Sequence, residues 1–277
     1  MKQLLLSAIC IASLFMAEGQ QLKTPQPSTT QTLKQDFGLG SIELSYSRPN
    51  MKGRKIFGDL VPFDKVWRTG ANGATTLTFT DEVTIGGTKI PAGKYGLLTI
   101  PSANEWTIIV SKQTDVTSPA AYKQEMDLVR VMAKPMTLPW SFETFGISLE
   151  NIKDNSCDVM MVWDKTLISF PITTDVDSKV MKQIETIMKS DSRPYSAAAA
   201  YYADNGKDLN QAVIWYDKAI EQNPKAFWLY YQKAKTLAKL GKKSEAMAVS
   251  MKSIELAKEA KNDDYVALNE KLQKDLK

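Results

Sequence analysis

One segment of the chain gathers residues that can grip an anion or a sugar. Between positions 48 and 68 it carries six basic side chains, opposed there only by Asp59 and Asp64: Arg48, Lys52, Arg54, Lys55, Lys65 and Arg68. An arginine holds a carboxylate, sulfate or phosphate with two parallel hydrogen bonds, and a tryptophan offers a face on which a sugar stacks. The candidate ligand-binding residues are Arg48, Arg54, Trp67, Arg68 and Asn72.

The same residues also have a structural interpretation, which we favour. Segments 48–50 and 52–54 have the composition of turns, and a long irregular connection between strands holds turns and binding residues alike. In this alternative Trp67 closes the end of a sheet, Arg68 pairs with one of the two aspartates, and Asn72-Gly73 forms a turn.

The amino-acid composition excludes several kinds of catalytic and metal site. The chain has no histidine, which excludes a Ser-His-Asp triad, a Cys-His pair and a His-bearing zinc site. Cys157 is interpreted as a small, half-buried hydrophobe, because no histidine can activate it. Carboxylate chemistry is left, but no two carboxylates have a spacing that selects a catalytic pair. We therefore expect no metal and no cofactor.

The first 19 residues have the order of a cleaved signal peptide. Lys2 precedes an apolar run from Leu4 to Met16, and small residues follow as far as Gly19. The run is too short for a transmembrane helix, and no later stretch is long and apolar enough for one. We expect a periplasmic or secreted protein. The net charge of +4 is mild, so nucleic acid is not an expected partner.

Residues 20–173 predict an all-β domain. Alternating apolar residues indicate strands over 41–47, 75–80, 105–111, 145–152, 157–163 and 166–172, with three more within 82–101. The Gly86-Gly87 step is typical of a tight hairpin. Many short strands separated by turns favour a β-sandwich or jelly-roll-like domain.

After position 173 the apolar period becomes helical, so the fold class is α+β with two kinds of domain. A linking helix is expected over 174–194, capped by Thr174 and carrying an apolar stripe. Residues 195–277 then repeat with a spacing of 34, as in Ala200 with Ala234 and Ala212 with Ala246. Ser250 and Ser253 depart from Tyr216 and Ala219 of the first unit, and 263–276 has the pattern of a terminal cap helix.

The repeats resemble tetratricopeptide repeats, which are built from helical hairpins. Two units fall below the three usually needed for an independent solenoid, so packing on a neighbouring element is the simpler interpretation. The alternative is a partner-docking groove. Its candidate residues are Tyr201, Tyr202, Trp215, Tyr230 and Tyr231.

Three motifs of the β half belong together: SRPNMKGRKIFG over 47–58, VWRTGAN over 66–72 and PAGKYGLLTIP over 91–101. Residues 27–172 as a whole resemble the family catalogued as domain of unknown function 2911. The resemblance implies an exported β-rich domain, often followed by helical repeats, and it implies no activity.

Three functions are consistent with these patterns. The first is an exported, non-catalytic binding protein whose β domain holds an anionic or glycan ligand and whose repeats dock a protein. The second is a histidine-free carboxylate hydrolase acting on envelope or dietary glycan. The third is a structural protein of the bacterial envelope. We favour the first.

Overall fold

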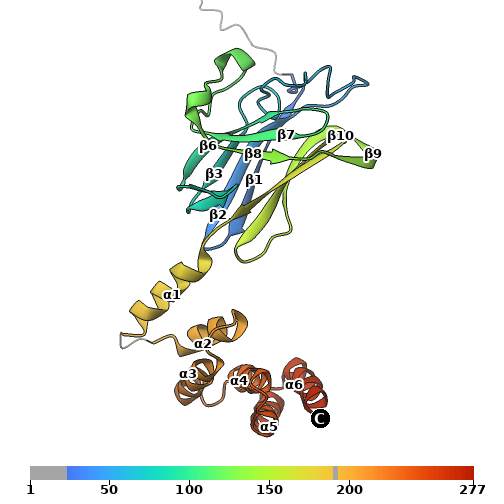
Figure 1. Cartoon of the computed structure of the whole chain (residues 1–277). Coiled ribbons are helices and arrows are strands. Elements are labelled where there is room, and N and C mark those ends of the chain that lie inside the picture. Colours follow the sequence, from blue (N-terminus) through green and yellow to red (C-terminus); the bar gives the residue numbers. More distant parts are fainter. Residues whose placement is uncertain (1–23, 190–192) are drawn as a thin grey trace, which may run out of the picture. The chain divides into compact units, whose positions relative to one another are not determined.

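The computed structural model describes residues 24–189 and 193–277, so the expected signal peptide lies outside the described residues. The chain divides into two compact units, the first ending at Thr174 and the second beginning at Asp175. As predicted, the first is built of strands and the second of helices (Figure 1). Within the described ranges, no helix has the length and apolarity needed to cross a membrane.

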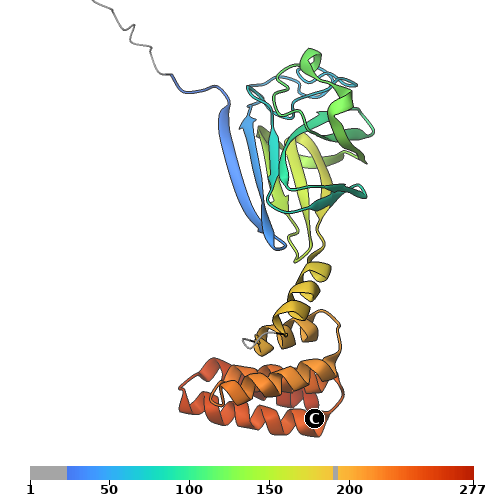
Figure 2. The ribbon, with the colours of Figure 1, turned by 90° about the vertical axis from the view of Figure 1, so that its left-hand side faces the viewer.

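The larger sheet of the β unit has six antiparallel strands in the order β1-β2-β3-β6-β7-β8. Their bounds are β1 (Thr29–Phe37), β2 (Gly40–Arg48), β3 (Thr76–Phe79), β6 (Gly93–Ile100), β7 (Trp106–Ser111) and β8 (Asp127–Ala133). The β1–β2 hairpin, drawn in blue, forms one edge of this sheet (Figure 2). The sequence analysis did not single out β1, because an edge strand with one buried residue, Phe37, has a weak apolar pattern.

The smaller sheet has four strands in the order β5-β4-β10-β9. They are β4 (Val83–Ile85), β5 (Thr88–Ile90), β9 (Met136–Glu150) and β10 (Ser156–Thr173). Gly86 and Gly87, with φ of 55° and 79°, make the predicted turn between β4 and β5. Positive φ is accessible to glycine without steric penalty, which explains the Gly-Gly step.

β10 is a single element of 18 residues, although the sequence predicted two strands there. Its flanking residues nevertheless meet, since the Thr174 amide donates to the Asn155 carbonyl at 2.9 Å. A straight strand of that length would separate its ends by roughly 60 Å. The chain therefore turns back within β10, at Asp164, whose φ is 49°.

The two sheets share one core. Inward residues of both sheets form one buried cluster, which includes the predicted Ile42, Leu44 and Tyr46 of β2 and also Val159 and Met161 of β10. Strand alternation places such residues on one face of each sheet, so stacking the two faces removes them from water. The outer face of β6 and β7 is covered separately, by the segment that contains η1 (Pro119–Ala121) and η2 (Gln124–Met126).

The helical unit contains α1 (Val176–Ile187), α2 (Tyr195–Asp204), α3 (Leu209–Gln222), α4 (Phe227–Lys239), α5 (Lys243–Glu259) and α6 (Asp263–Leu276). The predicted cap residue of α1 was wrong. Asp175 caps it, accepting from the Ser178 amide at 3.0 Å, while the Thr174 hydroxyl donates to the Glu82 carbonyl. A carboxylate suits the positive end of a helix.

The two hairpins of the repeat pack differently. Tyr216 and Ala219 of α3 are buried among apolar neighbours from α2 and α4. At the equivalent positions of α5, Ser250 and Ser253 are buried against Asn269 of α6. Asn269 accepts from the Ser250 hydroxyl at 2.9 Å and donates to the Ser253 hydroxyl at 2.9 Å. These two serines are thus the contact surface for the cap helix.

Candidate functional site

The connection 48–72 crosses one end of the β-sandwich, and Trp67 lies inside it. Main-chain bonds of 2.7 and 3.0 Å join Trp67 to Thr99 of β6, and its indole nitrogen donates to the Gly70 carbonyl at 3.0 Å. The Trp67 ring lies 5.0 Å from Phe145 and stacks 5.9 Å from Trp163. Its position is that of the structural alternative, closing the end of a sheet.

Five rings meet at this end, and we call them the aromatic cluster: Phe57, Trp67, Trp106, Phe145 and Trp163. Most of the contacts are edge-to-face or tilted, as the charge distribution of aromatic rings favours. The cluster joins β7, β9 and β10 to the irregular connection. It holds the connection in one conformation.

The first two candidate arginines hold the connection itself. The Arg48 guanidinium donates to the Phe145 carbonyl at 3.1 Å. Arg54 donates to the Met51 carbonyl at 2.8 Å and to the Asn50 carbonyl at 2.7 Å. Arg48 therefore ties the end of β2 to β9, and Arg54 stabilises a turn of the connection.

Arg68 and Asn72 reach other parts of the β unit. Arg68 donates to the Thr117 carbonyl at 2.7 Å, in place of the aspartate partner that the structural alternative expected. Asn72, in the left-handed conformation with φ of 55°, donates to the Ser28 carbonyl at 2.8 Å. The five candidates thus have separate carbonyl partners, and only Arg48 and Trp67 share a neighbour, Phe145.

Asn72 does line a polar depression of about 380 Å³ on the outer side of β1 and β2. Thr30, Ser45 and Ser47 line it as well. The Thr30 and Ser47 hydroxyls already bond each other at 3.1 Å. This depression is separate from the aromatic cluster.

A smaller pocket of about 140 Å³ opens beside the aromatic cluster, and we call it the ring pocket. Its lining combines aromatic rings with hydroxyl groups: Phe57, Phe63, Trp106, Ser102, Thr137 and Thr166. Two of these residues belong to the connection 48–72, so the connection does form a pocket, through its phenylalanines.

The local sequence explains the conformation of the loop that places Phe63 in the ring pocket. Gly58 has φ of 84°, and a Cβ there would lie 2.7 Å from the Phe63 ring, so only glycine leaves room for that ring. The Gly58 amide donates to the Val61 carbonyl at 2.9 Å. The Asp64 amide donates to the Pro101 carbonyl at 2.8 Å, which ties this loop to the one before β7.

The lining restricts the chemistry of the ring pocket to binding. It offers ring faces and hydroxyls, and none of its residues is a carboxylate, an amine or a thiol. In the part of the chain that the structure describes, no three His, Cys, Asp or Glu side chains are grouped to hold a metal ion. The sequence analysis missed this pocket because its residues come from four distant segments and have no charge pattern.

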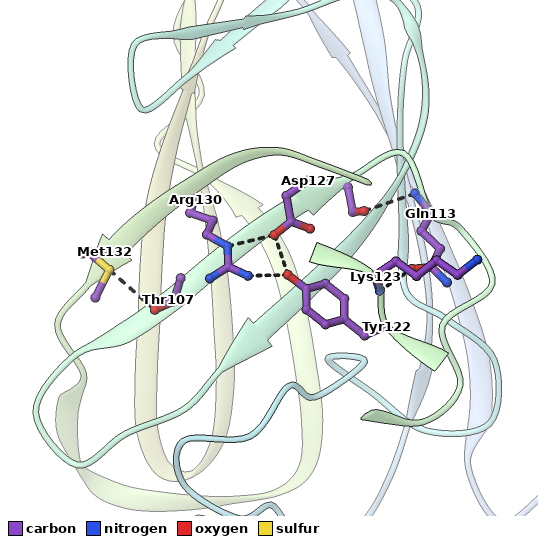
Figure 3. A network of polar contacts seen from close by, with 8 residues as sticks. Thr107, Gln113, Tyr122, Lys123, Asp127, Arg130 and Met132 are labelled. Carbon is purple, nitrogen blue, oxygen red and sulfur yellow. Dashed lines mark hydrogen bonds and ion pairs between the residues drawn. The ribbon is translucent and has the colours of Figure 1, made fainter. Parts of the chain in front are cut away.

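A partly exposed polar network, also unforeseen, fastens the segment that covers β6 and β7 (Figure 3). The Tyr122 hydroxyl donates to Asp127 at 2.5 Å and accepts from Arg130, which also bonds Asp127 at 2.8 Å. Burial and the hydrogen bond to Asp127 raise the pKa of Tyr122 to about 12. A tyrosine that holds its proton so firmly is a structural donor.

In the helical unit, two of the five predicted partner-binding residues come together. Tyr202 and Trp215 meet edge to face at 4.6 Å and line a groove of about 590 Å³. We call it the α1 groove, because its other wall is the apolar side of α1, with Met181, Ile184 and Met188. No residue of α1 among those described is buried.

The other three predicted aromatics have different neighbours. Tyr201 donates to Asp177 of α1 at 2.9 Å. Tyr230 packs against the cluster of Phe227 and Leu256, and Tyr231 contacts Tyr265 of α6 with ring centres 5.6 Å apart. The five residues therefore do not form one continuous groove.

Cys157 is fully buried at the start of β10. Burial raises the pKa of its thiol to about 11, so the reactive thiolate is scarce at neutral pH. It packs as a small hydrophobe in the core, as predicted, but it is fully buried where the sequence analysis expected half-burial.

Comparison with known proteins agrees with this architecture. The family model described as protein of unknown function (DUF2911) matches residues 28–172, and a tetratricopeptide repeat model matches residues 215–248. Neither the curated proteins nor the solved structures include a match. Because the first match spans more than half of the chain, this protein belongs to the DUF2911 family.

Proposed function

We propose that this is an exported, non-catalytic binding protein with two sites. The β unit binds an anionic or glycan ligand at the end formed by the connection 48–72, and the helical unit docks a protein partner. Export rests on the signal-peptide pattern of residues 1–19. The docking site rests on the groove lined by Tyr202 and Trp215, and the ligand site rests on the pocket lined by Phe57 and Phe63 of the connection.

The α1 groove carries the partner-docking part of the proposal. Tyr202 and Trp215 were selected from the repeat pattern, and both line a groove with the apolar side of α1. Interface hot spots are enriched in tryptophan and tyrosine, and an apolar groove between helices is suited to a protein segment. Lys182 and Glu185 at the groove can add polar contacts at its rim.

Site-specific photo-crosslinking in cells tests the docking part. A photoreactive residue at Met181, which lines the groove, is expected to give one discrete adduct that weakens strongly with Trp215→Ala. The control position is Leu268, an exposed residue of α6. Equal adducts at both positions, or an adduct that survives Trp215→Ala, contradict a specific docking groove.

A thermal-shift screen tests the ligand-binding part. Neutral, carboxylated, sulfated and phosphorylated glycans are compared on the same protein. A ligand at 100 times its dissociation constant stabilises the folded state by about 2.7 kcal/mol. The absence of any shift across the panel rejects a glycan ligand for the β unit.

A further inference from the structure

We propose that the ring pocket binds one neutral sugar ring at the end of a glycan. This inference rests on the proposed ligand-binding role of the β unit and assigns it a site and a ligand class. The sequence pointed to the arginines and Trp67, whose side chains are committed to main-chain carbonyls and to the aromatic cluster. The ring pocket uses a different set of residues.

The lining matches the two kinds of surface that a sugar presents. A pyranose has apolar C–H faces and a hydroxylated edge. Phe63, which is exposed, and the half-buried Phe57 supply aromatic surface for one face, while Thr137 and Thr166 supply hydroxyls that both donate and accept hydrogen bonds; Trp106 is buried behind them. Ligand sites of this kind combine aromatic walls with a few polar groups that fix orientation.

The absence of charge in the lining selects neutral sugars. No lining residue of the ring pocket is ionisable. A carboxylated or sulfated ring would lose hydration on entering such a pocket and would gain no ionic partner in return. The three arginines of the connection bond main-chain carbonyls instead, Arg54 those of its own loop, Arg48 that of Phe145 and Arg68 that of Thr117.

The volume sets the size of what enters. At 140 Å³ the pocket has the volume of about five water molecules, and it is smaller than the roughly 300 Å³ at which drug-sized sites begin. Because a hexopyranose is larger than that, the pocket accepts one hydroxylated edge of a terminal ring, and the remainder of that ring lies at the mouth of the pocket. The rest of a longer glycan must lie over the rim.

The strand that begins at the pocket, β9, offers an exposed apolar surface for that continuation. Met136 lines the pocket at the start of β9, and the same strand carries Trp140, which is 62% exposed, and Phe142, which is 36% exposed. Large apolar side chains grouped at a surface commonly mark a binding region. Trp140 is the exposed indole of this strand, so it takes the stacking role that the sequence analysis gave to Trp67.

The pocket is formed before any ligand arrives. The Phe57 ring lies 4.8 Å from Trp106 and 6.2 Å from both Trp67 and Trp163, so its orientation is fixed by three neighbours. Phe63 is seated on Gly58, and the loop is tied to Pro101. Binding therefore requires little ordering of the protein, which favours affinity for a small ligand.

Calorimetric titration of the full chain with neutral oligosaccharides of glucose, mannose, xylose and N-acetylglucosamine tests the assignment, with glucuronate and sulfated counterparts alongside. We expect at least one neutral series to bind, with affinity reduced at least tenfold by Phe63→Ala and by Thr137→Val. Thr137→Val keeps the shape of the side chain and removes the hydroxyl. Trp228→Ala, at an exposed indole of α4, is the matched control and should leave affinity unchanged.

The outcomes separate this inference from the proposed function. Neutral sugars that bind equally well to Phe63→Ala and Thr137→Val, but not to Asn72→Ala, overturn the ring pocket and move the ligand to the Asn72 depression. Binding of charged sugars alone overturns the ligand class. If no sugar binds up to its solubility limit, both this inference and the glycan part of the proposed function are rejected. Binding of an apolar peptide in place of sugars also overturns the assignment.

Discussion

The aromatic cluster of the β unit and the α5–α6 junction fix their surroundings by opposite means. In the cluster, five large rings interlock; Trp67 contacts the other four, and Trp163 contacts three. At the junction, the small side chains of Ser250, Ser253 and Asn269 satisfy one another by hydrogen bonds. The first arrangement depends on shape and buried apolar area, and the second depends on complete pairing of buried polar groups.

The difference predicts which amino-acid substitutions each region tolerates. A ring cluster loses stability in proportion to the volume removed, because a cavity remains. A polar junction loses stability when one partner is removed, but much less when all partners become apolar together. The following variants test this difference between the two regions.

Trp163→Ala is expected to have the largest effect. Removing a buried tryptophan that contacts three other rings should lower the free energy of unfolding of the β unit by about 3–5 kcal/mol. Denaturant titration measures it, followed by reaction of the Cys157 thiol in a Cys10→Ser background. That thiol is buried, so it reports opening of the β unit. A loss below about 1 kcal/mol would show that the cluster repacks and does not interlock.

Asn269→Leu is expected to cost about 1–3 kcal/mol in the helical unit, because the buried Ser250 hydroxyl loses its acceptor and the Ser253 hydroxyl, which still donates to the Phe227 carbonyl, loses its donor. Far-ultraviolet circular dichroism during denaturation measures the loss. The triple variant Ser250→Ala, Ser253→Ala, Asn269→Leu is the matched control, and it should recover most of the stability. If the triple variant is as unstable as the single one, hydrogen-bond pairing is not what fixes the junction.

Gly58→Ala tests whether the close packing of Phe63 on Gly58 stabilises the loop at the ring pocket. The left-handed backbone, with φ of 84°, should cost about 1–2 kcal/mol for alanine. Gly53→Ala has a similar φ of 71°, and an added methyl group there meets only open space, so it isolates the backbone penalty. Denaturation midpoints should place Gly58→Ala below Gly53→Ala, because only Gly58 lies under Phe63. Equal losses would mean that Phe63 moves aside freely.

Tyr122→Phe is expected to have the smallest effect, about 1 kcal/mol, through loss of the hydroxyl between Asp127 and Arg130. Its pH dependence has a defined sign. Burial raises the pKa of Tyr122 to about 12, above the ordinary tyrosine value of about 10. The stability from this group is therefore complete below pH 10 and is lost as the pH rises through 12. Unfolding followed by tryptophan fluorescence from about pH 9 upward should show the wild type approaching Tyr122→Phe, and a constant difference would contradict the shift.

The regular elements were predictable because each leaves a local pattern. Ile42, Leu44 and Tyr46 alternate along β2, and the Gly86-Gly87 step marks the β4–β5 hairpin. The 34-residue spacing of Ala212 and Ala246 likewise identified the paired helices. Such patterns arise from the period of a strand or a helix, so they survive without knowledge of the partners.

The site was harder to predict, because its chemistry depends on long-range contacts. The connection 48–72 was recognised as a candidate binding segment. In the sequence, however, Phe57 and Phe63 are ordinary apolar residues, and only the fold brings Thr137 and Thr166 beside them. Ser250 and Ser253 looked like departures from a repeat until Asn269, further along the chain, became their partner. Burial decides what such residues do, and burial is not a property of a short segment.

The pairing of Thr84 with Thr173 also sets the order in which the β unit can fold. β4 and β5 are synthesised well before the end of β10, so the apolar side chains of Val83, Ile85 and Ile90 await a segment that arrives 89 residues later. Contacts between distant segments slow folding, and uncovered strands associate with other chains in the meantime. The six-stranded sheet can assemble from earlier segments, so we expect closure of the sandwich to be the late kinetic step.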